Sequence, residues 1–416
     1  MAVLIPYGDR RVELEIPGDR LLGVLAARPA RGGNAAEMIR EAAAAPVAGP
    51  PLPAFAEPAE PVLVLVNDAT RPTPTAAMLE ALWPEISSWD LSFLVATGTH
   101  RAPSEEEMRR IFGGLWEEVR GSVRVHDARD AARLVPVGRT AAGTEVRLDQ
   151  KAMEAERLLV LSSVEAHYFA GYTGGRKIVL PGISGFDTIE QNHRLAMDER
   201  AQALWLEGNP VHEDMDEALG FLLEGRRLFS VLTVLDPAHQ IAAVAAGEVR
   251  TAFLKAAAAV DGLFSVPIAE KADIVVAVNT PPLDIDFYQA QKAVENGRLA
   301  LRNGGILIIV SACRTGIGND AFLKLMRSAG TPEEVIRKAR EDYHLGFHKA
   351  ARLAEVAACA RIWAVVGVND ETVRSAFMEP FPDIQSAVTE ALAKRPQGRV
   401  WVLMDAGVTV PRPVKM

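Results

Sequence analysis

Short runs of β-forming apolar residues alternate with segments of helical composition along the first half of the chain. Three runs, Val62–Val66, Leu91–Ala96 and Leu158–Leu161, are long enough for buried strands and too short for helices. Polar or glycine-rich residues follow each run, and a helical pattern comes after them. Such alternation predicts an α/β fold with a parallel sheet, in which sites lie at the carboxyl ends of the strands.

The rest of the pattern extends this organisation. The turn residues Gly8 and Asp9 lie between alternating apolar positions and predict a hairpin, and a second unit is predicted to begin near Val266. Ser104 with Glu107 has the spacing of a helix capping box. Further strands are expected at Leu228–Leu235, Ile241–Ala245, Ile274–Val278, Ile306–Val310, Ile362–Val366 and Val400–Met404, and helices at Asn34–Ala45, Thr75–Trp83, Phe287–Arg302 and Pro382–Lys394. From its residues, the final strand could close either sheet.

Length and composition favour a globular protein of two domains. The chain has 416 residues, of which 49% are hydrophobic and 24% charged, and this excludes disorder as a class. Its 45 basic and 54 acidic side chains give a net charge of −9, which makes nucleic acid an unfavourable partner. Two cysteines cannot form a disulfide framework or a thiolate zinc site. Without a membrane-length apolar run or a secretory signal, we expect a cytoplasmic protein that does not bind membranes.

Polar side chains follow three of the predicted strands. Asp68 and Arg71 follow the first, His100 the second, and His167 with Lys177 the third. Each has a structural alternative, since Asp68 alone could cap a helix and a lone histidine is commonly a hydrogen-bonded structural residue. Taken together, two histidines, an arginine and a lysine crowd like charges and cost stability unless a ligand uses them.

The glycine-rich stretch Ala170–Gly185 is a weak signal by itself. Backbone without Cβ atoms can approach a phosphate closely, but the spacing is neither that of a Walker loop nor GxGxxG. The alternative is a crossover whose glycines only allow tight packing. In the second unit, Tyr288 and Lys292 lie one helical turn apart with Gln289 beside them, although a solvated helix has the same pattern.

Together these segments resemble the nickel-dependent lactate racemase family. They run from near residue 60 to near residue 320 in the family's order and spacing, and none of the family's named positions is changed. The matching stretches are DATRPTPT (Asp68–Thr75), ATGTHR (Ala96–Arg101), EAHYFAGYTGGRKIVLPGISG (Glu165–Gly185), NH (Asn192–His193), FYQAQKA (Phe287–Ala293) and SACRTGIG (Ser311–Gly318).

The resemblance implies a nickel pincer nucleotide, a pyridinium mononucleotide with two sulfur-bearing arms that hold nickel. In the family one arm is joined to a lysine, here Lys177, and a histidine ligates the metal, here His193. A flat three-point ligand with one imidazole suits the square-planar preference of Ni(II). Asp68, Gly174 and Gly175 are expected at the cofactor.

The resemblance also implies a racemase or epimerase that inverts C2 of a 2-hydroxy acid through a 2-keto acid. His100 and His167 correspond to the acid and base on opposite faces of the substrate. Arg71 and Lys292 fall where the family binds the substrate carboxylate, and Tyr288 and Gln289 line the same pocket. The expected partners are this small acid and the proteins that make the cofactor. The substrate's tail, which could be a methyl, a second carboxylate, an aryl group or a polyol, stays open.

The family organisation implies two α/β domains with mostly parallel, doubly wound sheets and an active-site crevice between them. Residues 1–264, with 395–416 returning, are expected to form the cofactor-binding and catalytic domain, and 265–394 the domain that closes over the substrate. Two rival functions remain at this point. One is a nicotinamide-dependent 2-hydroxy acid dehydrogenase, disfavoured by the missing GxGxxG, and the other is a non-catalytic binding protein for a nickel nucleotide or small acid.

Overall fold

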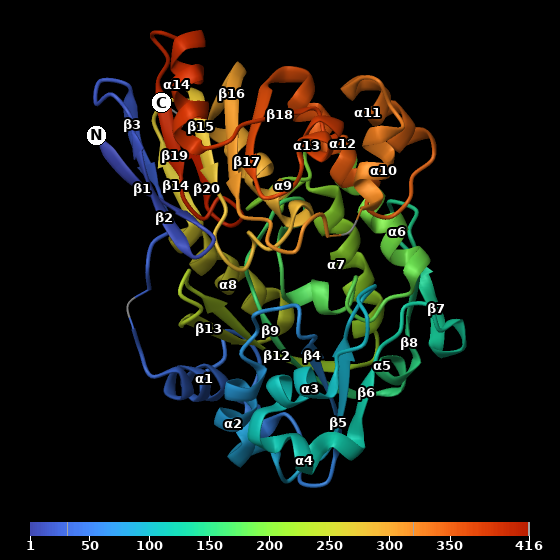
Figure 1. Cartoon of the computed structure of the whole chain (residues 1–416). Helices are drawn as coiled ribbons and strands as arrows, with labels where there is room; N and C mark the ends of the chain where they lie inside the picture. The colour runs from blue at the N-terminus through green and yellow to red at the C-terminus, as the bar shows by residue number, and fades with distance from the viewer. Residues whose placement is uncertain (31, 319, 415–416) are drawn as a thin grey trace. The chain divides into compact units, whose positions relative to one another are not determined.

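The computed structural model describes residues 1–30, 32–318 and 320–414, which divide into two compact units (Figure 1). One unit is Arg28–Leu263, and the other combines Met1–Ala27 with Phe264–Met416. Each unit contains a six-stranded sheet that is wholly or largely parallel. The predicted two-domain α/β class with large parallel sheets is therefore confirmed.

The sheet of unit 28–263 has the strand order β13-β12-β9-β4-β5-β6. All neighbours are parallel except β12 and β13, which run antiparallel. From β4 the chain moves outward to β5 and β6, returns to β9 on the other side of β4, and then moves outward again. The strand order therefore reverses between β4 and β9, which is where ligands bind in doubly wound sheets. The strands are β4 (Pro61–Asn67), β5 (Asp90–Ala96), β6 (Val123–Val125), β9 (Arg157–Ser163), β12 (Arg227–Leu235) and β13 (Ile241–Gly247).

The helices of this unit and its smaller elements connect and cover these strands. The helices are α1 (Ala35–Ala44), α2 (Thr75–Ile86), α3 (Glu105–Phe112), α4 (Trp116–Val119), α5 (Gln150–Glu154), α6 (Phe186–Arg194), α7 (Pro210–Leu223) and α8 (Val249–Phe264). Short 3₁₀ helices lie at Leu52–Ala54, Gly113–Leu115, Arg120–Ser122, Ala131–Arg133, Gly175–Ile178 (η5) and Leu195–Met197. Two-stranded pairs are β7 (Leu134–Arg139) with β8 (Glu145–Asp149), and β10 (Ala166–His167) with β11 (Gly171–Tyr172).

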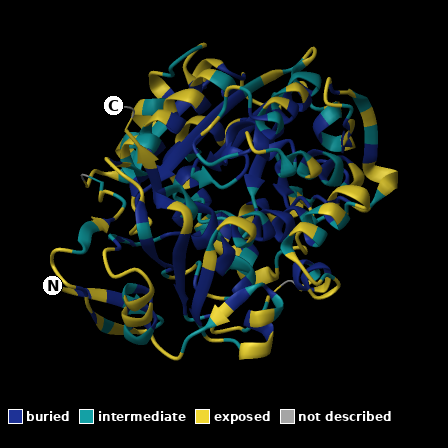
Figure 2. Cartoon of the chain, turned by 90° about the horizontal axis from the view of Figure 1, so that it is seen from above, coloured by how far each residue is buried: buried dark blue, intermediate teal, exposed yellow. Residues whose placement is uncertain are grey.

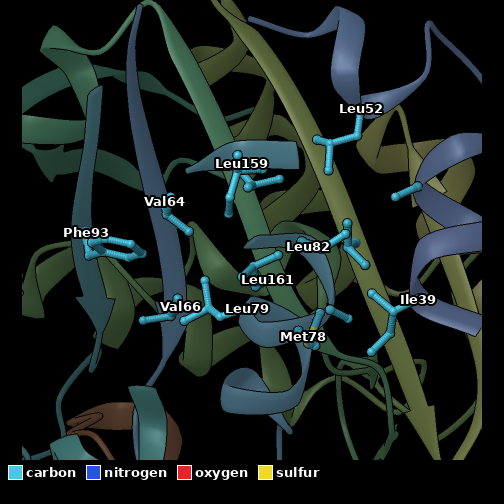
Figure 3. Close-up of a cluster of buried hydrophobic side chains, with 14 of the residues drawn as sticks. Ile39, Leu52, Val64, Val66, Met78, Leu79, Leu82, Phe93, Leu159 and Leu161 are labelled. Carbon is cyan, nitrogen blue, oxygen red and sulfur yellow. The ribbon is translucent and has the colours of Figure 1, made fainter. Parts of the chain in front are cut away.

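A continuous apolar core explains why the middle strands form. Five successive residues of β4, Val62–Val66, are buried, as expected for a parallel strand covered on both faces. Val64 and Val66 pack in one cluster with Leu79 and Leu82 of α2 (Figure 3). Sheet strands are likewise mostly buried in Figure 2. Burying each such side chain contributes about 1.5–3 kcal/mol, so the strand ends that carry the polar residues rest on a rigid base.

The other unit is built on the wholly parallel order β18-β17-β16-β15-β19-β3. Its strands are β3 (Leu21–Leu25), β15 (Ala272–Val278), β16 (Leu301–Ser311), β17 (Arg361–Val366), β18 (Met378–Pro380) and β19 (Val400–Leu403), with the pairs β1 (Ala2–Tyr7) and β2 (Arg10–Glu15), and β14 (Ser265–Ile268) and β20 (Val410–Pro413). Its helices are α9 (Phe287–Gly297), α10 (Ala321–Arg327), α11 (Pro332–Glu341), α12 (Phe347–Cys359), α13 (Asp370–Ser375) and α14 (Ile384–Lys394), with a 3₁₀ helix at Arg298–Ala300.

Two expectations about this unit were wrong. The strand expected to be the last, β19, pairs with β15 and β3, so residues 395–416 do not return to the first domain, and residues 1–27 also belong here. The reason is packing, because Val400 and Val402 complete the core formed by Ile274 and Val276. The helix expected over Phe287–Arg302 ends at Gly297, since the chain must turn and enter β16 at Leu301.

No helix in the described part of the chain combines the length and the apolar character that a membrane span requires.

Shortening a central core side chain should test the stability of unit 28–263. Phe93 is fully buried, and its ring contacts the Phe112 ring edge-to-face with the two centroids 5.4 Å apart. We expect Phe93→Ala to lower the free energy of unfolding by about 3–5 kcal/mol, because it removes apolar contacts and leaves a cavity. Leu254→Ala, at a side chain that is 56% exposed, is the control and should cost far less. Urea unfolding followed by circular dichroism measures both, and equal losses would contradict this description of the core.

Candidate active site

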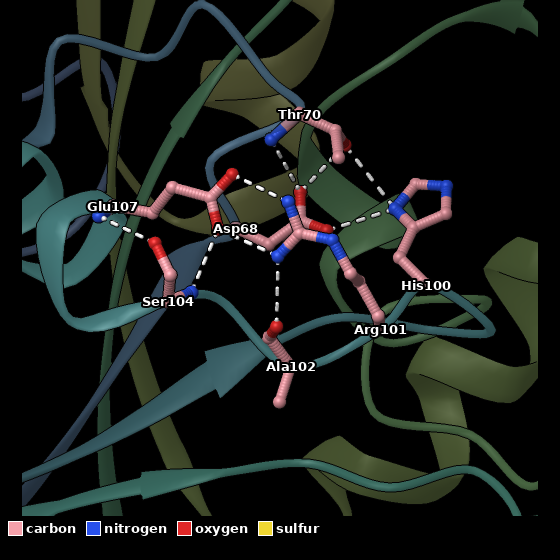
Figure 4. A network of polar contacts seen from close by, with 7 residues as sticks. All are labelled: Asp68, Thr70, His100, Arg101, Ala102, Ser104 and Glu107. Carbon is pink, nitrogen blue, oxygen red and sulfur yellow. Dashed lines mark hydrogen bonds and ion pairs between the residues drawn. The ribbon is translucent and has the colours of Figure 1, made fainter.

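The end of β4 places a buried carboxylate against His100 (Figure 4). Asp68 is 4% exposed, and its Oδ2 lies 2.8 Å from His100 Nδ1. The Thr70 hydroxyl donates to the other oxygen of Asp68 at 2.7 Å. A carboxylate facing Nδ1 keeps the proton on that nitrogen. The Nε2 atom of His100, turned away from Asp68, therefore has its lone pair free to accept a proton.

Arg101, next to His100, has a structural role instead. Its guanidinium forms two 2.7 Å bonds to Glu107, the N3 residue of the capping box that starts α3 (Figure 4). The predicted capping box of Ser104 and Glu107 is confirmed. The hydrogen bonds from Arg101 lower the pKa of the Glu107 carboxyl to about 2. Arg101 thus helps to hold the loop that carries His100.

The ring of Phe169 brings three of the predicted site residues together. Its centroid lies 4.5 Å from the His167 ring and 5.2 Å from the His193 ring, both edge-to-face. The Lys177 ammonium nitrogen lies 5.6 Å from the same centroid. His167, Lys177 and His193 belong to β10, η5 and α6, so side chains from three different elements share one aromatic neighbour.

His167 has the opposite hydrogen-bond arrangement to His100. The backbone N–H of Ala170 donates to His167 Nδ1 at 3.2 Å, across the tight turn between β10 and β11. An Nδ1 that accepts a hydrogen bond leaves the proton of a neutral imidazole on Nε2. In this arrangement His167 presents a proton and His100 presents a lone pair.

Burial and nearby positive charge alter the two groups that the resemblance assigns to the cofactor. Lys177 is 9% exposed, and its pKa is well below the usual range, first through burial and then through Arg71 and Arg176. The pKa of His193 falls to about 3, again mainly through burial and then through Lys177. Burial thus favours the uncharged form of both groups, and the imidazole of His193 is neutral at pH 7. A neutral amine is nucleophilic, and a neutral imidazole can ligate a metal.

Arg71 lies close to this pair, since its charge acts on both Lys177 and His193. Arg71 lies in the turn after β4, where its backbone N–H donates to the carbonyl oxygen of Asp68 at 3.2 Å. The candidate site of unit 28–263 thus joins the ends of β4, β5 and β9, the strand ends that the sequence singled out.

The glycines behind Lys177 are explained by packing. Gly174 and Gly175 have φ values of +72° and +53°. A Cβ on Gly174 would lie 2.6 Å from Ser163 O, and one on Gly175 would lie 2.9 Å from the Phe253 ring. The tight-crossover alternative therefore accounts for these glycines, and their role at the cofactor stays a prediction.

Tyr288, Gln289 and Lys292 lie on α9 of the other unit. Asp286 caps this helix by accepting from Gln289 N at 2.7 Å, and the backbone of Ile317 accepts from Tyr288 N at 3.0 Å. The SACRTGIG segment thus fixes the start of α9. Burial raises the pKa of the Tyr288 hydroxyl to about 12.

Asp284 and Asp286 are two neighbouring carboxylates, a pattern that only weakly indicates a hard-cation site. Both are engaged by the protein itself, since Asp284 pairs with Arg314 at 3.3 Å and Asp286 is the helix cap. Over residues 1–30, 32–318 and 320–414, no three His, Cys, Asp or Glu side chains group as a metal site.

Sequence reasoning missed Phe169, Thr70 and Lys349, although the first two lie inside the quoted motifs.

A doubly wound sheet that carries two histidines with different hydrogen-bond partners and a buried lysine after its strand ends is a candidate active site of an α/β enzyme. Residues 7–204 match the lactate racemase N-terminal domain family, and residues 268–411 match the lactate racemase C-terminal domain family. A lactate racemase of Thermoanaerobacterium thermosaccharolyticum is 30% identical over 399 residues, 92% of this chain and 92% of that one. A lactate racemase of Lactiplantibacillus plantarum is 28% identical over 351 residues, 82% and 81% of the two chains.

Solved structures agree with this assignment. The lactate racemase apoprotein of Thermoanaerobacterium thermosaccharolyticum matches with a TM-score of 0.91 at 28% identity, covering 99% of this chain and 100% of that one. A Thermotoga maritima protein matches with a TM-score of 0.69 at 17% identity, over 91% and 98% of the two chains, which supports the fold alone. The chain belongs to the lactate racemase family and is an isomerase.

Stability below neutral pH should depend on the partly buried His212, whose ring stacks on Phe253. Burial, followed by the charge of Arg176, lowers the pKa of His212 from 6.5 to about 3. Between these values the unfolded chain binds one proton more, so the free energy of unfolding falls as pH falls from 6.5 toward 3. We expect His212→Gln to reduce the loss between pH 7 and pH 5, by up to about 2 kcal/mol at 1.36 kcal/mol per pKa unit.

Urea unfolding of wild type and variant at both pH values measures this difference. Phe253→Leu is the control. It removes the ring that stacks on His212 with the two centroids 6.2 Å apart, and it removes no titrating group. It should lower stability by similar amounts at both pH values. An unchanged pH dependence in His212→Gln would contradict the assignment of a neutral His212.

Proposed function

We propose that the protein is a racemase or epimerase that inverts C2 of a 2-hydroxy acid with a nickel pincer nucleotide. The observation that carries the proposal is the gathering of His167, Lys177 and His193 around the Phe169 ring. Burial lowers the pKa of Lys177 and of His193, and His167 presents a proton donor. The assignment of lactate as the substrate of the relatives supports a small 2-hydroxy acid here.

The residues fit such a cofactor chemically. The amine of Lys177, whose lowered pKa makes the uncharged form easier to reach, suits a covalent bond to one arm of the nucleotide, and the neutral imidazole of His193 suits the nickel. Asp68, Gly174 and Gly175 are proposed to line the cofactor. When bound, the group would supply reversible hydride acceptance, so that a 2-hydroxy acid passes through a flat 2-keto acid.

The two histidines would handle the hydroxyl proton. His100, with Nδ1 on Asp68, accepts the proton at Nε2, and the buried carboxylate stabilises the imidazolium that results. His167, with Nδ1 accepting from Ala170 N, donates from Nε2. Inversion of C2 would require hydride to return to the opposite face of the flat keto acid, while the second histidine would return the proton to the carbonyl oxygen. For the other enantiomer the two protonation states exchange.

The carboxylate of the substrate needs a separate anchor. Arg71 suits it because a planar guanidinium can bind both oxygens. Lys292, Tyr288 and Gln289 of α9 are proposed as further substrate-binding residues on the strength of their place in the family motif. The geometry of the described residues sets no limit on the tail beyond C2.

The direct test follows optical rotation with single enantiomers of several 2-hydroxy acids and cofactor-loaded protein. The panel should contain lactate, a dicarboxylic acid, an aryl acid and a sugar acid. We expect inversion of at least one enantiomeric pair without added nicotinamide. Nicotinamide absorbance changes on turnover would instead indicate the dehydrogenase, and failure across the panel would count against a racemase.

Substitutions should separate catalysis from cofactor attachment. We expect His100→Ala and His167→Ala each to lower kcat by about 10²–10⁴-fold, the contribution of a positioned acid or base, while both retain the cofactor. Lys177→Ala should lack the added mass in intact-mass spectra of protein co-expressed with the cofactor pathway. Full activity in both histidine variants would favour the non-catalytic carrier, and unchanged added mass in Lys177→Ala would overturn the attachment site.

A further inference from the structure

A second buried lysine contacts the proposed substrate-binding helix. Lys349 of α12 is 7% exposed, and its Nζ lies 3.2 Å from the centroid of the Tyr288 ring. The same nitrogen donates to the backbone oxygen of Tyr288 at 3.1 Å. One amine thus contacts both the ring and the main chain of a single residue in the first turn of α9.

A buried ion pair also joins α12 and α9. Arg352, one turn after Lys349 on α12, donates two hydrogen bonds of 2.8 and 2.7 Å to Glu295. Glu295 lies two turns after Tyr288 on α9. Arg352 and Glu295 are 2% and 7% exposed, so the ion pair is buried. The Phe322 ring, 5.9 Å away, packs against the Tyr288 ring as well. Tyr288 is therefore held by α12 and α10 together.

Packing alone does not account for a lysine at this place. Burial and the nearby charge of Lys292 lower the pKa of the Lys349 amine well below its usual range. A methionine of similar length would fill the space without this desolvation cost. What the amine adds is a hydrogen-bond donor for Tyr288 O and a polar contact on the face of the ring. Both additions act on the orientation of Tyr288.

We propose that Lys349 is a positioning residue that fixes the Tyr288 ring and the first turn of α9 in the orientation required for substrate binding. Lys292 is one turn from Tyr288 on the same helix, so a rotation of this turn would displace both proposed substrate contacts. The kinetic consequence rests on the proposed function. The contact between Lys349 and Tyr288 does not, and it can be measured separately.

The structural arm uses protein labelled with 3-fluorotyrosine and ¹⁹F NMR. The chain has five tyrosines, and Tyr288→Phe assigns the resonance of Tyr288. We expect Lys349→Met to shift or broaden this resonance, because the amine over the ring is lost. Tyr168 and Tyr172 of the other unit are internal references. Tyr343 is not a reference, since its hydroxyl lies 2.7 Å from Nδ1 of His348, the neighbour of Lys349.

The kinetic arm compares KM and kcat of the loaded enzyme. We expect Lys349→Met to raise KM about tenfold and to change kcat much less, because the loss is in substrate binding. Lys349→Arg, which keeps N–H donors for the backbone oxygen and the ring of Tyr288, should recover most of the affinity. Lys324→Met on α10, at a side chain that is 74% exposed, is the matched control and should resemble wild type. If Lys349→Met folds poorly, Lys349→Gln tests the same loss of the amine from the face of the Tyr288 ring.

The outcomes separate this proposal from the proposed function. An unmoved Tyr288 resonance with wild-type KM in Lys349→Met would overturn it, even if the enzyme racemises normally. A loss confined to substrates with a second carboxylate, with Tyr288 unmoved, would also overturn it and make Lys349 a substrate ligand. If wild type racemises no acid, the proposed function fails, while the ¹⁹F arm still decides whether Lys349 positions Tyr288.

Discussion

Removal of Lys177 and His193 from water is the constraint on which the candidate site depends. Burial suppresses the charge of both groups, and the apolar ring of Phe169 adjoins both. Exposed to water, the lysine would be a charged ammonium. An ammonium is not a nucleophile, and a nearby arginine repels it. The closeness of Arg71 and Arg176 then strengthens the effect, since a third positive charge among them is disfavoured. The chemistry proposed for this site follows from that loss of charge.

A rigid sheet makes such burial possible. β4, β5 and β9 lie side by side, and their apolar residues are covered on both faces, so their ends cannot easily move apart. Asp68 and His100 emerge from two of these ends, and His167 from the third. The reversal of strand order between β4 and β9 leaves this edge open to a ligand. Glycines at 174 and 175 then allow η5 to approach the end of β9 closely enough to place Lys177 there.

The two buried lysines show how neighbours decide what one side-chain type does. Lys349 lies 3.2 Å above a ring and donates to a backbone oxygen, so its amine is engaged by Tyr288. Lys177 lies 5.6 Å from the Phe169 centroid, beside arginines and a neutral imidazole. The histidines differ in the same way, because Asp68 and the backbone of Ala170 select opposite tautomers. Residue type alone does not distinguish the members of either pair.

Much of this protein is determined by local sequence. Continuous apolar runs such as Val62–Val66 can only be stable as strands covered on both faces, and Ser104 with Glu107 satisfies a helix start through neighbouring atoms alone. The sequence motifs likewise indicate that His100 and His167 follow the ends of strands. Tertiary structure decided the features that depend on contacts between separate elements. β19 joins β15 and β3, and the Lys349 amine contacts the Tyr288 ring. The Phe169 ring likewise contacts side chains from three elements of the site. A strand such as Val400–Leu403 has the same apolar composition whichever sheet it completes, so only the packing of both cores could choose between them.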